Sequence, residues 1–187
     1  MGDPKILVAG VGNIFLGDDA FGVEVVAQLR DRSLPPQVLV VDFGIRGLDL
    51  TYALLDGYDA VILVDAVPRG GPPGTLYVLE QKPLDAAAAI AGPPPIEAHR
   101  LEPARVLHLV SALGGRVERL LVVGCEPVPL DEFEDIRPGL SDAARAAVPL
   151  AVDRIVQLVD ELLGRHEPAA NPLLSVARPA QQPTVTS

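Results

Sequence analysis

Short aliphatic runs that end at glycine or at an acid alternate with segments of helical spacing, and this alternation most constrains the fold. Runs without polar residues are typical of strands that are covered on both faces of a sheet. Four such runs predict buried strands: Lys5–Ala9, Gln37–Asp42, Asp59–Asp65 and Arg119–Gly124. Gly74–Glu80 instead alternates apolar and polar residues after a GGPPG turn, which indicates an antiparallel edge strand.

Segments with apolar residues at helical spacing lie between and after these strands, and we expect Ser141 to be the N-cap of the last one. Strands that alternate with helices predict a mainly parallel sheet with helices on both faces. We therefore expect one α/β domain over residues 1–165 and a disordered tail over residues 166–187, where apolar patterning is lost. The predicted helices are Asp18–Arg32, Leu48–Leu55, Glu102–Leu113 and Ser141–Leu163.

The net charge of the chain limits the classes of partner that it can bind. A net charge of -10 argues against nucleic acid and anionic membrane surfaces, which need clustered Lys and Arg, and suits a cationic partner or a metal ion. Cys125 is the only cysteine, so the chain has no internal disulfide and no cysteine-cluster metal site. Because it shows neither a signal peptide nor an apolar stretch long enough to span a membrane, we expect a cytoplasmic protein.

The segment that follows the first strand has the glycines of a phosphate-binding turn but not its charge. Gly10 and Gly12 fit a dinucleotide fingerprint, whereas Phe15 stands at its third glycine position. Asp18 and Asp19 stand at the expected helix start, where carboxylates would repel a pyrophosphate. A nucleotide-dependent enzyme is therefore the weaker interpretation, which NAD or ATP titration would test.

The two adjacent acids suggest two different roles. Asp18 is the better candidate for the helix N-cap, where a side-chain oxygen accepts a hydrogen bond from a backbone amide. Asp19 is not needed for capping, and the helix dipole favours its ionised form, which a metal ligand requires.

Asp65 and His99 are the other candidate ligands. Asp65 ends the third predicted strand, where a turn-forming aspartate is an equally simple explanation. His99 precedes a predicted helix, where a surface or capping role is also possible. Two carboxylates and an imidazole together suit zinc or nickel. Cys125 is expected to be a small core residue, whereas Glu126 follows the last strand and is expected to line the same cleft.

Four segments, in order, resemble hydrogenase maturation endopeptidases, which remove the C-terminal extension from the large subunit of nickel–iron hydrogenases. The resemblance covers about Lys5 to Leu163. Its most specific part is the N-terminal signature. The matching segments are GVGNIFLGDDAFGVEVV (Gly10–Val26), VILVDAV (Val61–Val67), HRLEPARVLHLVSALG (His99–Gly114) and VVGCEP (Val122–Pro127).

The resemblance implies a three-layer αβα domain around a mixed, mostly parallel, twisted five-stranded sheet. It also implies a catalytic and metal-contacting triad, which maps onto Asp19, Asp65 and His99. The metal would be nickel carried by the substrate, with a zinc- or cadmium-like ion as a possible surrogate. Asp19 is one methylene shorter than the glutamate common at its position, and Ala20 replaces a frequent glycine.

The same resemblance places the substrate, a hydrogenase large-subunit precursor, along glycine-rich turns. Gly10, Gly12 and Asn13 would form a cleft wall to which a peptide backbone can come close, although a tight strand–helix turn explains them equally well. The turn at Gly44–Gly47 has Ile45 and Arg46 where the family commonly has a Gly-Gly-Thr turn, so contacts of Gly44 with substrate would differ. A monomer is expected. Two rivals are a chaperone that binds the nickel-bearing subunit without cutting it and a related endopeptidase with another substrate.

Overall fold

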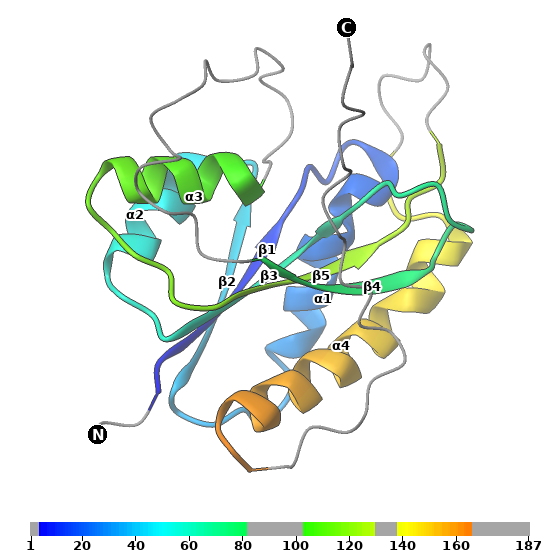
Figure 1. Ribbon diagram of the computed structural model, residues 1–187. Helices are drawn as coiled ribbons and strands as arrows, with labels where there is room; N and C mark the ends of the chain where they lie inside the picture. Colours follow the sequence, from blue (N-terminus) through cyan, green and yellow to red (C-terminus); the bar gives the residue numbers. More distant parts are fainter. Residues whose placement is uncertain (1–3, 82–102, 130–137, 166–187) are drawn as a thin grey trace, which may run out of the picture.

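The computed structural model describes residues 4–81, 103–129 and 138–165, and in this part of the chain five strands form one sheet in the order β2-β1-β3-β5-β4 (Figure 1). Neighbouring strands are parallel except at the edge, where β4 runs antiparallel to β5. This is the mixed, mostly parallel sheet that the sequence predicted. The strands are β1 (Ile6–Val11), β2 (Val38–Gly44), β3 (Ala60–Ala66), β4 (Leu76–Gln81) and β5 (Leu120–Cys125).

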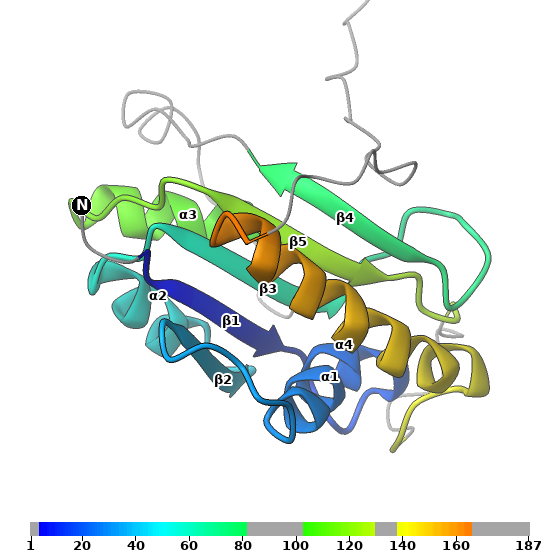
Figure 2. The same cartoon turned by 90° about the horizontal axis from the view of Figure 1, so that it is seen from below.

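Two pairs of helices cover the two faces of the sheet and complete three layers (Figures 1 and 2). Helix α1 (Phe21–Leu29) packs with α4 (Asp142–Leu162) on one face, and α2 (Gly47–Leu55) packs with α3 (Pro103–Ala112) on the other. Each pair seals its own apolar core against the sheet. A short 3-10 turn, η1 (Gly17–Ala20), leads from β1 into α1.

The aliphatic runs form the central strands because these strands are covered twice. Every residue of β1 and of β5 is buried, as is the first part of β3, from Ala60 to Val64. The predicted strands and helices are confirmed within a few residues at each end, and Ser141 is the N-cap of α4, accepting a hydrogen bond from the Ala144 N–H at 3.2 Å. The predicted loop at Ala86–Pro95 and the tail at 166–187 lie outside the described residues.

The order of the strands places a candidate site at one edge of the sheet. The chain passes from β1 to β2 on one side and then crosses to β3 on the other side of β1. In such sheets, ligands bind beyond the carboxyl ends of the strands where the strand order reverses. Asp19, which follows β1, and Asp65, the second-to-last residue of β3, both lie at this end.

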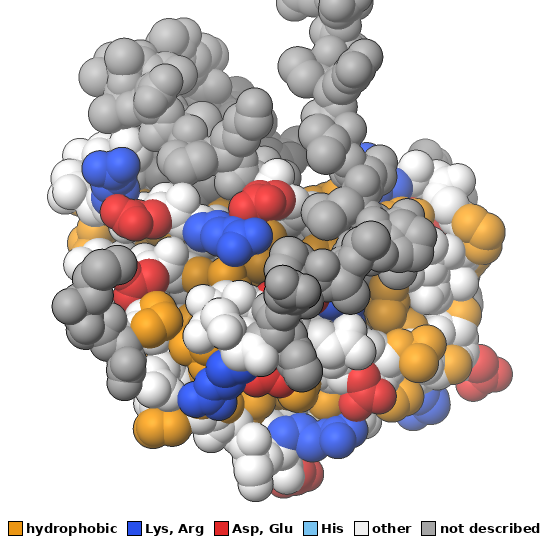
Figure 3. All heavy atoms as spheres, turned by 60° about the horizontal axis from the view of Figure 1, so that its bottom comes forward, with side chains coloured by type: hydrophobic (Ala, Val, Ile, Leu, Met, Phe, Trp, Pro, Cys, Tyr) orange, Lys and Arg blue, Asp and Glu red, His pale blue; other side chains and the backbone are white. Residues whose placement is uncertain are grey.

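The face shown in Figure 3 has basic and acidic side chains interspersed, with hydrophobic side chains between them. Among the described residues on that face, Lys and Arg are not gathered into a patch of the kind that nucleic-acid binding requires. None of the helices in the described ranges is long and apolar enough to cross a membrane.

Candidate active site

The turn after β1 holds Asp19 in a fixed position. One carboxylate oxygen of Asp19, Oδ2, accepts a hydrogen bond from the Asn13 N–H at 2.7 Å. The Asn13 side-chain oxygen in turn accepts from the Phe15 N–H at 3.0 Å, and the Asn13 carbonyl accepts from the Leu16 N–H at 3.1 Å. These bonds tie Asp19 to the end of β1. Among the described residues, none accepts a hydrogen bond from the side-chain NH₂ of Asn13.

Two glycines allow η1 and α1 to lie directly on the end of β1. A Cβ on Gly12 would come within 1.7 Å of the Asp19 carbonyl oxygen, and Gly12 has a φ of +134°. A Cβ on Gly10 would come within 2.5 Å of both the Gly22 carbonyl oxygen and Val26. The tight-turn explanation therefore accounts for both glycines, and their contact with a substrate stays a prediction.

We expect Gly12→Ala to lower the free energy of unfolding by at least about 2 kcal/mol, because it combines a backbone clash with an unfavourable φ. Gly57→Ala is the matched control: Gly57 also has positive φ, at +73°, but nothing lies within 4 Å of the position of its Cβ. The control is expected to lose only about 1 kcal/mol. Urea unfolding of both variants checks this, and equal losses would contradict the close approach of η1 to Gly12.

Asp65 meets the same edge from β3. It is half-buried, and its Oδ1 accepts a hydrogen bond from the N–H of the next residue, Ala66, at 2.8 Å. The start of α1 packs on this strand, since a Cβ on Gly22 would lie 2.1 Å from the Val64 carbonyl oxygen. Because η1 also contacts β3, the structure brings the segments that carry Asp19 and Asp65 together.

The third predicted ligand, His99, lies outside the described residues. Within the ranges that are described, no three His, Cys, Asp or Glu side chains are grouped closely enough to hold a metal ion. The three-ligand site of Asp19, Asp65 and His99 therefore stays a prediction, and two of its members have been placed.

The prediction that Asp18 caps its own helix is wrong. Neither η1 nor α1 has a side-chain N-cap hydrogen bond. Asp18 is instead buried and joins distant parts of the chain: its Oδ1 accepts from the Ser141 N–H at 2.7 Å, and its Oδ2 accepts from the Val128 N–H at 2.8 Å and the Ser141 hydroxyl at 2.9 Å. Asp18 thus fastens the start of α4 and the segment after β5 to η1, a role that no local sequence pattern could reveal.

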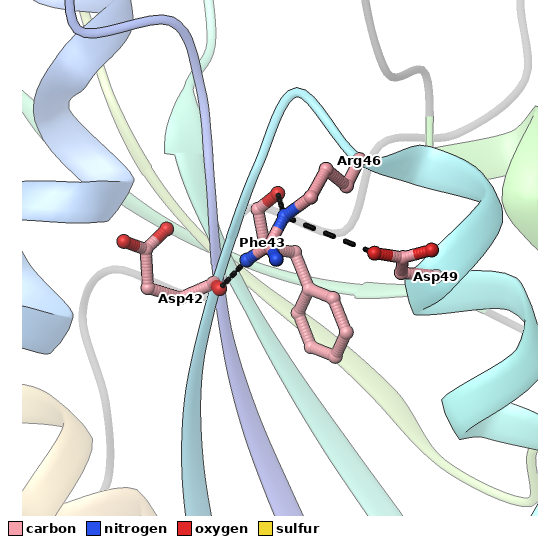
Figure 4. A network of polar contacts seen from close by, with 4 residues as sticks. All are labelled: Asp42, Phe43, Arg46 and Asp49. Carbon is pink, nitrogen blue, oxygen red and sulfur yellow. Dashed lines mark hydrogen bonds and ion pairs between the residues drawn. The ribbon is translucent and has the colours of Figure 1, made fainter.

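The turn between β2 and α2 is closed by Arg46 (Figure 4). The Arg46 Nε donates to the Phe43 carbonyl at 3.1 Å and Nη2 donates to the Asp42 carbonyl at 2.6 Å, while Asp49 lies 3.9 Å from Nε. The Asp42 side chain points away from Arg46 (Figure 4). Gly44 has a φ of +54°, which favours glycine, and a Cβ there would be in ordinary van der Waals contact with Asp42 Oδ1 at 3.7 Å. Its contact with substrate stays a prediction.

Glu126 is buried, and its carboxylate accepts hydrogen bonds from the β3–β4 loop and from β4. It accepts hydrogen bonds from the Arg69 N–H, from the Gly70 N–H and, at 2.7 Å, from the Tyr77 hydroxyl. Burial acts to raise the pKa of Glu126, but the hydrogen bonds from Tyr77, Arg69, Gly71 and Gly70 together outweigh it, and the pKa lies below its ordinary value. Its predicted contact with substrate stays a prediction.

A group with a lowered folded-state pKa stabilises the fold above its unfolded-state pKa and loses this contribution as pH falls through the folded-state value. For Glu126 the contribution is therefore complete above its ordinary pKa of 4.5 and declines below it. We expect the stability difference between the wild type and Glu126→Gln, measured by urea unfolding from about pH 7 to pH 3, to narrow at the acidic end. A difference that stays constant over this range would contradict the assignment.

Cys125 is a core residue, as predicted. It is 1% exposed, and burial, with smaller contributions from the charges of Asp18 and Glu126, raises the pKa of its thiol to about 12. A neutral buried thiol is a poor nucleophile.

Comparisons with known proteins identify the family of the chain. Residues 23–158 match the sequence model of the HycI family, described as hydrogenase maturation protease. The hydrogenase expression/formation protein HupD of Thiocapsa roseopersicina is 32% identical over 157 residues, which cover 83% of this chain and 69% of HupD. HupD of Rhizobium leguminosarum bv. viciae is also 32% identical, over 91% of this chain and 84% of that protein.

Solved structures extend the likeness to the fold. The hydrogenase maturating endopeptidase HybD from E. coli is 29% identical, with a TM-score of 0.67 over 84% of this chain and 93% of HybD. A hydrogenase 2 maturation peptidase from a Thaumarchaeota archaeon is 32% identical, with a TM-score of 0.58 over 87% of this chain and 99% of that one. The family match spans most of the chain, and the relatives are similar over most of their own length, so this chain belongs to the hydrogenase maturation protease family.

Proposed function

We propose that this chain is an endopeptidase that removes the C-terminal extension of a nickel–iron hydrogenase large-subunit precursor after nickel insertion. The observation that supports this most directly is the placing of Asp19 and Asp65 at the carboxyl ends of β1 and β3, where the strand order reverses. Both residues are half-buried, so each remains partly exposed to solvent in the described part of the chain.

Two carboxylates at this edge can serve peptide hydrolysis in two ways. A carboxylate can accept a proton from the attacking water as general base. Carboxylates and an imidazole can also contact nickel, which in this proposal arrives in the precursor's own cysteine site as part of the substrate. Nickel held there can polarise the scissile carbonyl. Asp19, Asp65 and His99 are the residues that we assign to these contacts.

The neighbouring turns suit an extended peptide. Gly12 and Gly44 are joined by a hydrogen bond from the Gly12 N–H to the Gly44 carbonyl at 3.0 Å, so the two glycine turns form one continuous surface beside Asp19. The Asn13 amide offers N–H donors to a peptide carbonyl. We assign Gly12, Asn13 and Gly44 to the wall along which the precursor's C-terminal segment lies. Gly10, which the sequence placed in the same wall, is buried beneath α1 and supports the wall without facing it.

Mass spectrometry of a purified nickel-loaded precursor incubated with this protein tests the proposal. We expect the precursor to lose one C-terminal segment and a peptide of the complementary mass to appear. A stable complex of unchanged precursor mass would contradict the proposal and support a non-proteolytic chaperone. The cytoplasmic location and the monomeric state stay predictions, which fractionation and light scattering would test.

A further inference from the structure

One residue, Glu126, holds both ends of the loop that follows Asp65, here called the 67–75 loop after its residue numbers. The backbone of Glu126 pairs with the end of the loop: its carbonyl accepts from the Gly74 N–H and its N–H donates to the Thr75 carbonyl, both at 2.8 Å. Its side chain turns to the start of the loop. There the Arg69 N–H is shared by both oxygens, at 3.0 and 2.9 Å, and the Gly70 N–H donates to Oε1 at 3.0 Å.

The Glu126 side chain is a strong acceptor in this position. It is 5% exposed, and its Oε2 also accepts from the Tyr77 hydroxyl at 2.7 Å. Hydrogen bonds to an ionised carboxylate are about twice as strong as bonds between neutral groups. The lowered pKa of Glu126 agrees with an ionised side chain that these donors hold.

Residues of the loop pack closely against Tyr77, which donates to Glu126. A Cβ on Gly71 would lie 2.3 Å from the Tyr77 hydroxyl oxygen, so a side chain there would displace the hydroxyl from Glu126. The Arg69 guanidinium lies over the Tyr77 ring, 5.5 Å from its centre, which covers the hydrogen-bonded group from outside. The loop is therefore packed as well as hydrogen-bonded.

The 67–75 loop follows directly on Ala66, which is one hydrogen-bond donor to Asp65. Asp65 Oδ1 accepts from the Ala66 N–H, and the next N–H, that of Val67, donates to the Cys125 carbonyl at 2.8 Å. Gly124 makes this approach possible, because a Cβ there would lie 2.7 Å from the Val67 side chain. Ala66, whose N–H one Asp65 oxygen accepts, therefore stands directly before the loop, so the strand end and the loop are one continuous stretch of backbone.

We propose that Glu126 is a positioning residue that, through the Arg69 and Gly70 amides, fixes the strand end carrying Asp65 for peptide cleavage. This inference rests on the proposed function. It gives Glu126 a different role from substrate contact, because its carboxylate already accepts from three donor groups of the chain itself: the Arg69 N–H, the Gly70 N–H and the Tyr77 hydroxyl.

Three variants of the full-length protein test this role. Glu126→Gln keeps one oxygen acceptor, but its amide NH₂ must face at least one of the N–H or O–H donors that surround both oxygens. Tyr77→Phe removes only the hydroxyl bond. Glu80→Gln is the matched control, because it removes a carboxylate of β4 that pairs with the exposed Arg119 at 2.7 Å and forms neither a hydrogen bond nor an ion pair with the described residues of the loop.

Two quantities are measured: hydrogen exchange of the Arg69 and Gly70 amides, and cleavage kinetics with nickel-loaded precursor. For Glu126→Gln we expect exchange at least about tenfold faster and kcat about 10–100-fold lower, with KM within about threefold of wild type. Tyr77→Phe should shift both in the same direction by a few-fold, and Glu80→Gln should shift neither. A loop that is only structural would exchange faster without losing kcat.

Faster exchange with unchanged kcat, or unchanged exchange in Glu126→Gln, would overturn the inference. If Glu126→Gln does not fold, Tyr77→Phe decides by the same two measurements. If the wild type does not cleave the precursor, the proposed function has failed and the positioning role falls with it. Hydrogen exchange of the Arg69 and Gly70 amides still shows in that case whether Glu126 holds the loop.

Discussion

Asp19→Asn is expected to abolish precursor cleavage while the protein stays folded. Asp18→Asn, at the neighbouring residue, is expected to lower the stability of the protein while cleavage is kept. The Asp19 change keeps an oxygen that can accept from the Asn13 N–H, so the turn survives. It removes the negative charge that proton transfer or contact with nickel requires, and we expect the rate to fall at least about 100-fold. Cleavage assays and thermal unfolding of both variants check this pair.

Asp18→Asn acts on the fold because both of its oxygens face N–H donors. Whichever way the new amide is turned, its NH₂ meets the N–H of Val128 or of Ser141. Leaving such a buried donor without an acceptor costs about 1–3 kcal/mol. We expect a lower midpoint of unfolding and, well below it, a cleavage rate within about tenfold of wild type, since an intact site is all that catalysis needs. The roles given to the two acids would be contradicted if Asp19→Asn cleaved precursor at the wild-type rate, or if Asp19→Asn lost stability and Asp18→Asn did not.

The second large effect concerns the substrate. A precursor prepared without nickel is expected to be cut at least about 100-fold more slowly than the nickel-loaded form, because carbonyl polarisation or recognition by Asp19, Asp65 and His99 would be lost. Product formation from the two precursors, followed by intact mass, measures this. Equal cleavage of nickel-free precursor would contradict the role given to nickel.

A binding measurement on the same two precursors separates recognition from chemistry. The protein's Asp65→Asn variant is used because it is expected not to consume the substrate, while Asp19 and His99 keep the nickel contacts that we assign to them. If nickel serves in the chemical step, this variant binds both precursors with similar affinity. If nickel serves in recognition, the variant binds the nickel-free precursor much more weakly.

The fold was predictable from the sequence because its determinants are local. Strands buried on both faces must be aliphatic throughout, so β1, β3 and β5 appear as short apolar runs. The alternating pattern of Gly74–Glu80 likewise indicated the antiparallel edge strand that β4 forms. Asp19 and Asp65 could be placed together because strand ends in a parallel sheet share one edge.

The roles of Asp18 and Glu126 could not be predicted because their partners are far away in the chain. Asp18 binds residues more than 100 positions away, and Glu126 binds Arg69, 57 positions away. A helix-start aspartate has the same local pattern whether it caps its own helix or fastens another. His99 lies outside the described residues, so its place beside Asp19 and Asp65 rests on the resemblance alone.

The most direct test of the account compares the wild type with the double variant Asp19→Asn/Asp65→Asn, each incubated with nickel-loaded precursor and followed by native and denaturing mass spectrometry. We predict that the wild type yields two products whose masses sum to precursor plus one water, whereas the double variant leaves the precursor at unchanged mass. Cleavage by the folded double variant at the wild-type rate would show that these two carboxylates do not carry the reaction.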